Sequence, residues 1–149
     1  MLDNDKVFTM KAIVPSSNKT WEGKQVWTVG YGSNDHLNIV DTKVLPEFVC
    51  SNLFSRDYNP NLMICAGDLN GGKDSCNGDG GGPLLLKRKD GDPNEMQLLL
   101  GIVAYGLSES NEVQCGSKNT GSVYTKIPSF LSWIQDVKDK YESERNNGK

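Results

Sequence analysis

The chain has 149 residues and a net charge of −3, with 23% charged and 36% hydrophobic residues. This length fits one domain with a hydrophobic core of its own. The charge balance lacks the basic bias of a nucleic-acid-binding surface, and no apolar run is long enough to span a bilayer, so we expect neither nucleic acid nor a membrane as a partner.

The first 15 residues lack the pattern of a secretory signal, which is a basic segment followed by a long apolar stretch.

Short strands are predicted along most of the chain. Pro46 is suited to a first helical position, which predicts a short helix within residues 45–54. The polar segment 87–95 resembles a hairpin loop. Alternating or strongly apolar segments predict strands at 24–29, 37–45, 61–67, 82–88, 96–106 and 121–127.

The periodicity changes near the C-terminus. Phe130, Leu131, Ile134 and Val137 fall on one face of a helix that Pro128 begins. This predicts a helix over residues 128–141, followed by a polar tail, 142–149, that we expect to be disordered. About six short strands and one terminal helix favour an antiparallel barrel or sandwich.

The cysteine spacing indicates an oxidising compartment. None of the spacings is C-x-x-C, so a zinc site or a thioredoxin-type redox motif is disfavoured and no metal is expected. An even number at wide spacing is typical of two disulfides in a secreted protein, with three pairings open. The four cysteines are Cys50, Cys65, Cys76 and Cys115.

One segment carries a strong motif. Residues 74–83 read DSCNGDGGGP and match D-S-C-x-G-D-S-G-G-P at nine of ten positions, counting the free one. Four more blocks follow the same family order: TVGYG, MICAG, GIVAYG and VYTKIPSFLSWI. The sequence therefore resembles the chymotrypsin-like (trypsin-type) serine proteases, specifically their C-terminal β-barrel.

The resemblance implies an all-β fold. We expect a six-stranded antiparallel Greek-key barrel with a C-terminal α-helix over residues 1–141, the C-terminal half of a trypsin-like peptidase domain. It also implies disulfides between Cys50 and Cys65 and between Cys76 and Cys115. The N-terminal barrel is absent and would be expected to dock on this one. The family uses no cofactor, and none is expected here.

The catalytic residues that the family requires are missing. Acyl transfer by this family needs a serine nucleophile, a histidine base and an orienting aspartate. Gly80 stands at the serine position, and the other two residues would come from the N-terminal barrel. Ser75 corresponds to a pocket position and cannot simply substitute. The only histidine, His36, is interpreted as a solvent-exposed loop residue.

Other parts of the site are retained. The backbone N–H groups of Gly78 and Gly80 occupy the oxyanion-hole positions, which need no side chain. The resemblance places Asp74 at the base of the primary specificity pocket, where it would pair with a substrate Lys or Arg. Asp79 corresponds to the aspartate that pairs with the N-terminal amine formed by activation cleavage. Without that amine it would need another partner, stay solvated, or leave the loop zymogen-like.

The walls of the pocket differ from the family pattern. The resemblance places Ala104, Tyr105 and Gly106 along the bound peptide, with Tyr105 as an aromatic platform. Ser122 replaces a pocket-wall glycine, which would narrow the pocket and hinder Arg more than Lys.

Three hypotheses follow for the function. The first is a catalytically inactive protease homologue that binds peptides or proteins. The second is a truncated or altered form of an active, secreted endopeptidase that cleaves after Lys or Arg. The third is an autonomous single-barrel binding module, which would need no second barrel.

Overall fold

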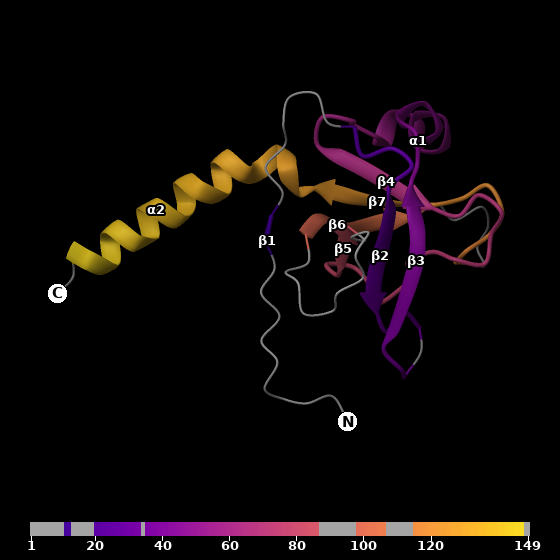
Figure 1. Ribbon diagram of the computed structural model, residues 1–149, viewed down its shortest axis with the longest axis horizontal. Coiled ribbons are helices and arrows are strands. Elements are labelled where there is room, and N and C mark those ends of the chain that lie inside the picture. The colour runs from indigo at the N-terminus through magenta and orange to yellow at the C-terminus, as the bar shows by residue number, and fades with distance from the viewer. Residues whose placement is uncertain (1–10, 13–19, 34, 87–97, 107–114, 148–149) are drawn as a thin grey trace.

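The computed structural model describes residues 11–12, 20–33, 35–86, 98–106 and 115–147 (Figure 1). Strands dominate, with one short helix between them and one long helix at the end. The elements are β1 (Lys11–Ala12), β2 (Gln25–Gly30), β3 (Asn38–Val44), α1 (Glu47–Phe54), η1 (Ser55–Asp57), β4 (Met63–Gly67), β5 (Pro83–Leu86), β6 (Leu98–Gly106), β7 (Ser122–Lys126), η2 (Ile127–Phe130) and α2 (Leu131–Asn147).

Six of the strands close into an antiparallel barrel. The sheet order is β6-β5-β2-β3-β4-β7, and β6 also pairs with β7, which closes the ring. Strand β5 lies beside β2 after the β2-β3-β4 meander, which is the Greek-key arrangement. The predicted six-stranded barrel with its terminal helix is therefore confirmed. A two-residue strand, β1, adds in parallel to β6 and was not predicted.

The barrel interior is filled by alternate side chains of the strands. Val26, Leu84 and Leu100 are fully buried, and Tyr124 is 1% exposed. A second cluster lies between the barrel and α1, around Phe54, Cys50 and Val123. Burial of these side chains is the main stabilising term of the barrel.

Two disulfides brace the fold. Cys50 of α1 is bonded to Cys65 of β4, and Cys76 is bonded to Cys115. These are the two pairings that the family resemblance implied, so that prediction is confirmed.

The element boundaries differ locally from the predictions. Pro46 adopts an extended conformation (ψ 144°) directly before α1, so it precedes the first helical residue. The loop predicted at residues 87–95 lies outside the described residues.

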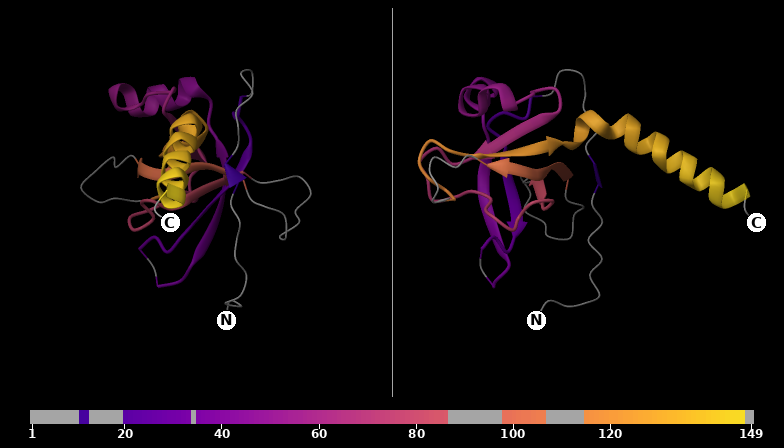
Figure 2. Two further views of the ribbon diagram at one scale, coloured as in Figure 1. Left: turned by 90° about the vertical axis from the view of Figure 1, so that its left-hand side faces the viewer. Right: turned by 180° about the vertical axis from the view of Figure 1, so that it is seen from behind.

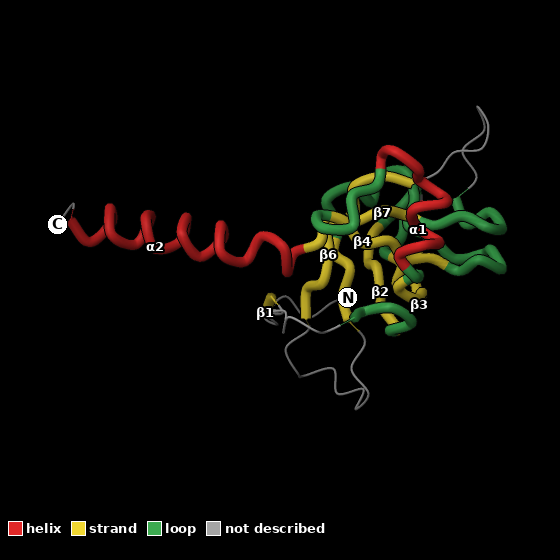
Figure 3. The backbone as a smooth tube through the Cα atoms, turned by 90° about the horizontal axis from the view of Figure 1, so that it is seen from above, coloured by secondary structure: helices red, strands yellow, loops and turns green. Residues whose placement is uncertain are grey.

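The terminal helix is longer than predicted. It begins as the 3-10 turn η2 and continues as α2 to Asn147, so most of the segment expected to be disordered is helical. Figures 2 and 3 show α2 projecting away from the barrel. Trp133, Ile134, Val137 and Tyr141 are between 38% and 64% exposed on it. In the described part of the chain, no helix has the length and apolar character to cross a membrane.

The buried strand positions give a direct stability test. Leu84→Ala removes a fully buried side chain from the barrel, and we expect a loss of about 2–5 kcal/mol in the free energy of unfolding. Leu37→Ala is the matched control, because Leu37 is 45% exposed, and it should cost less than about 1 kcal/mol. Urea unfolding of the full-length gene product measures both, and equal losses would contradict the assigned core.

Candidate functional site

The segment of residues 74–83, called the glycine loop from here on, leads into β5. The N–H of Asp79 donates to the carbonyl of Cys76 at 3.0 Å, which forms a turn inside the loop. Gly81 N–H donates to the Val103 carbonyl at 2.9 Å, and Val103 N–H donates to Gly82 at 2.8 Å. These bonds attach the loop to the middle of β6.

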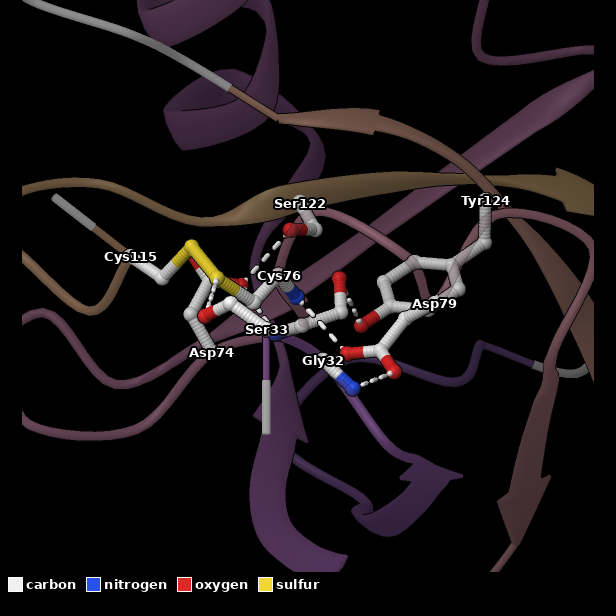
Figure 4. Close-up of a disulfide and its surroundings, with 9 residues drawn as sticks. Gly32, Ser33, Asp74, Cys76, Asp79, Cys115, Ser122 and Tyr124 are labelled. Carbon is white, nitrogen blue, oxygen red and sulfur yellow. Dashed lines mark hydrogen bonds between the residues drawn. A yellow bond between two sulfur atoms is a disulfide. The ribbon is translucent and has the colours of Figure 1, made fainter. Parts of the chain in front are cut away.

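The Asp79 carboxylate fastens the same loop to the turn after β2. It accepts hydrogen bonds from the Gly32 N–H at 2.7 Å and from the Cys76 N–H at 2.8 Å (Figure 4). Asp79 is only 9% exposed, so these two donors satisfy a carboxylate that is largely removed from water. A Cβ at Gly30 would overlap this carboxylate, which explains the glycine there.

The glycines of the loop differ in what their backbone requires. Gly78 has φ +96°, and a Cβ there would overlap the Gly32 carbonyl oxygen. A Cβ at Gly82 would lie 2.8 Å from the Asp79 carbonyl oxygen. Gly80 is different: its φ lies outside the left-handed region, and a Cβ would meet no neighbouring heavy atom within 4 Å. The fold therefore does not require glycine at position 80.

The free backbone donors of this loop include the two N–H groups that were predicted to form the oxyanion hole. Within the described residues, neither the N–H of Gly78 nor that of Gly80 donates a hydrogen bond. Both residues are exposed. These are the two groups predicted to form the oxyanion hole, and that role stays a prediction.

Asp74 lies half-buried at the start of the loop. Its Oδ1 accepts hydrogen bonds from the Ser122 hydroxyl at 2.6 Å and from the Ser75 N–H at 2.8 Å. Burial raises the pKa of the Asp74 carboxyl, while the hydrogen bonds from Ser122, Ser75 and Gly116 oppose that shift. The predicted pocket-base carboxylate is thus partly engaged by the protein itself.

Ser122 connects Asp74 to the end of β6. It is 2% exposed, is paired with Gly106 across the β6–β7 register, and directs its hydroxyl toward Asp74 (Figure 4). A Cβ at Gly106 would lie 3.2 Å from the Ser122 oxygen. The narrowing of the pocket by Ser122 stays a prediction, and its hydrogen bond to Asp74 was not predicted. The signal that could have indicated this bond was Ser122 itself, a hydroxyl residue at a position where the family pattern has a pocket-wall glycine.

Tyr105 contacts residues of α1 and η1. It is half-buried, and its ring meets Phe54 edge-on with centroids 5.7 Å apart. Its hydroxyl donates to the carbonyl of Asp57. Burial, together with nearby Asp57, raises the pKa of the Tyr105 hydroxyl. The adjacent Ala104 is exposed. The anchoring by Phe54 and Asp57 was not visible in the sequence.

The contacts of Ser75 and His36 do not indicate a catalytic role for either residue. Ser75 is 7% exposed, and the Tyr124 hydroxyl lies 3.5 Å from its oxygen. Burial raises the pKa of Tyr124 to about 12, so this phenol stays protonated. His36 is exposed in the turn between β2 and β3, and its carbonyl accepts a hydrogen bond from Asn38 at 2.8 Å.

A cavity of about 230 Å³ is lined by residues of the turn after β2 and of the glycine loop. Its walls include Asp74, Asp79, Lys73 and the Cys76–Cys115 disulfide. Among the described residues, no group of three or more His, Cys, Asp or Glu side chains is arranged to hold a metal ion.

The Greek-key barrel and the glycine loop together define a scaffold of the chymotrypsin-like serine protease type. The Trypsin family model matches residues 4–134, and the chain belongs to that family. Mouse (Mus musculus) kallikrein 1-related peptidase b11 is 41% identical over 106 residues, which cover 71% of this chain and 35% of the relative.

Two further relatives show the same partial coverage. Rat (Rattus norvegicus) submandibular glandular kallikrein-3 is 39% identical over 69% of this chain and 47% of its own length. The bovine (Bos taurus) suppressor of tumorigenicity 14 protein homolog is 32% identical over 82% of this chain and 14% of its own length. The chain therefore spans half or less of these curated relatives.

The raised pKa of Asp74 gives a prediction for stability against pH. The folded protein holds this proton more tightly than the unfolded chain, so ionisation of Asp74 destabilises the fold as pH rises above the ordinary value of about 3.9. Asp74→Asn abolishes this ionisation and keeps an oxygen acceptor. We expect its unfolding free energy, relative to the unmodified protein, to increase from about pH 3 to about pH 7.

Urea unfolding at a series of pH values measures this trend. Ser122→Ala is the companion variant, because it removes a donor that favours the ionised carboxylate. It should deepen the loss of stability at neutral pH. A relative stability of Asp74→Asn that falls with rising pH would contradict the prediction.

Proposed function

We propose that this protein is a catalytically inactive member of the Trypsin family that binds peptide or protein segments bearing Lys or Arg. The observation that carries the proposal is Gly80. The nucleophile position has no side chain, although the fold leaves room for one. The glycines that the backbone does require, Gly78 and Gly82, are retained around it.

The proposed binding uses groups of the site that act without the catalytic serine. The Asp74 carboxylate would pair with a cationic side chain through charge-assisted hydrogen bonds. The last three residues of β6 lie opposite the start of β7 and would contact the backbone of a bound peptide. They are Ala104, Tyr105 and Gly106. Because Ser122 fills space and occupies one oxygen of Asp74, the pocket should favour Lys over the larger Arg.

A second folded unit is part of the proposal. The curated relatives are at least twice as long as the matched segments, and α2 presents an exposed apolar stripe formed by Trp133, Ile134, Val137 and Tyr141. An N-terminal barrel packed against this chain would cover such a surface. An autonomous single-barrel module would leave the stripe exposed, which makes that hypothesis the weakest. The two disulfides support an extracellular location.

The second candidate function is an active Lys/Arg-directed endopeptidase. The open space at Gly80 supports it, because a serine there would fit without strain. Sequencing the transcript decides between the two: a serine codon at position 80, with an upstream histidine and aspartate, would establish the active enzyme.

The proposal predicts binding without cleavage. The full-length gene product should not hydrolyse Lys or Arg ester and amide substrates, and a serine-reactive phosphonate should not label it. Gly80→Ser tests whether the nucleophile alone is missing, because any activity it gains would require the remaining catalytic groups to be in place. Phosphonate-sensitive cleavage by the unmodified protein would overturn the proposal.

Binding itself is tested with a lysine-containing peptide and its norleucine analogue. The lysine peptide should bind at least about tenfold more tightly, because a hydrogen-bonded charge pair with Asp74 is lost in the analogue. Asp74→Asn should remove most of this difference. Ser51→Ala, an exposed residue of α1, serves as the control and should preserve it. Equal affinity for the two peptides would contradict the role of Asp74.

A further inference from the structure

Two Asn-Gly pairs lie in the part of the chain that the structure describes. They are Asn70–Gly71 and Asn77–Gly78, and the glycine of a third pair, Asn147–Gly148, lies outside the described residues. In such a pair the glycine nitrogen can attack the side-chain amide carbon of the asparagine, because glycine has no side chain that hinders the approach. The attack requires the peptide group between the two residues to rotate. The hydrogen bonds of that peptide group therefore decide how readily the pair reacts.

The peptide group between Asn77 and Gly78 is not held by hydrogen bonds. Within the described residues, the Gly78 N–H has no acceptor, and neither the carbonyl nor the side-chain amide of Asn77 has a partner. Both residues are exposed. The turn around them is closed by the flanking residues, because the Asp79 N–H donates to the Cys76 carbonyl at 3.0 Å (both residues are labelled in Figure 4). Rotation of the 77–78 peptide group therefore breaks none of the hydrogen bonds of the described residues.

The peptide group between Asn70 and Gly71 is held in place. The Gly71 N–H donates to the Asp68 carbonyl at 2.8 Å, and the Asn70 N–H donates to the Asp68 carboxylate at 3.0 Å. The next residue is also engaged, because the Gly72 N–H donates to the Gly116 carbonyl at 2.6 Å. Asn70 is exposed like Asn77, so exposure does not distinguish the two pairs. Hydrogen bonding does, because attack by the Gly71 nitrogen requires its bond to Asp68 to break.

We propose that Asn77 is a site of spontaneous deamidation in the folded protein. The Gly78 nitrogen loses its proton to the solvent and bonds to Cγ of Asn77. The bond from Cγ to Nδ2 then breaks, and ammonia leaves with a proton from water. Water opens the resulting succinimide at one of its two carbonyls, which gives aspartate or isoaspartate. The reaction needs no oxidant, reductant or cofactor, and it does not depend on the proposed binding function.

Both products change the glycine loop. Each adds a carboxylate to a segment that already contains Asp74 and Asp79. Isoaspartate also carries the main chain through the former side chain, which inserts one methylene group between Cys76 and Gly78. This insertion lies inside the turn that the Asp79 N–H closes on the Cys76 carbonyl. Deamidation therefore alters the loop with time and without any catalyst.

The experiment follows both pairs in one molecule. The folded full-length gene product is incubated at mildly alkaline pH, reduced, digested with trypsin and mapped by mass spectrometry. Cleavage at Lys73 places Asn70 and Asn77 on separate peptides. Asn77 should convert about threefold to tenfold faster than Asn70, the factor expected for the one hydrogen bond that Asn70 must break. The reduced chain in urea is the control, and there the two residues should convert at similar rates.

Two variants identify the reacting residue. Isoaspartyl methyltransferase should label the aged unmodified protein, and Asn77→Gln should remove most of the label because the longer side chain cyclises slowly. Asn70→Gln, the matched control, should retain it.

Three results would overturn the proposal. In the first, Asn70 converts as fast as Asn77 in the folded protein. In the second, Asn77 converts only in the unfolded chain, which would mean that the turn protects it. In the third, the unfolded chain shows the same preference for Asn77, which would then arise from the local sequence and not from the fold.

Discussion

The buried carboxylate of Asp79 is the interaction on which the candidate site depends. It joins two segments 47 residues apart by accepting the Gly32 N–H, and it closes its own loop by accepting the Cys76 N–H. A carboxylate this poorly exposed to water is costly unless its oxygens find donors. Two backbone N–H groups meet that need here, and they fix both the turn after β2 and the start of the glycine loop. Gly30 and Gly78 are required because the two segments approach so closely.

Further bonds attach the glycine loop to the barrel. Backbone bonds between Val103 and the end of the glycine loop tie the loop to β6, and the Cys76–Cys115 disulfide ties it to the segment before β7. The Ser122 hydroxyl then joins β7 to Asp74. These partners lie on β6, on the segment between β6 and β7, and on β7, so the geometry of the loop depends on the β6–β7 pairing that closes the barrel.

The sequence predicted the elements and the barrel, because strand patterns are local and the family motifs occur in order. It did not predict contacts that depend on closure. Ser122 and Asp74 are 48 residues apart, and no local pattern tells which group the hydroxyl meets. The end of α2 was placed too early because apolar periodicity stops near Tyr141. Polar residues continue the helix, including the Lys138–Glu142 pair at i,i+4, which itself contributes only about 0.3–0.5 kcal/mol.

The glycines of the loop differ in whether the backbone requires them. This difference determines how the loop keeps its shape when position 80 lacks a side chain. Gly78 and Gly82 are held by steric contacts, so replacing them would disturb the Asp79 turn. Gly80 has no such contact, and removing a hydroxymethyl group there disturbs nothing that the loop needs for its shape. The proposed loss of catalysis follows from the missing nucleophile, because catalytic groups of this kind act together. The proposed binding depends only on backbone donors and on Asp74, and these groups do not require a side chain at position 80.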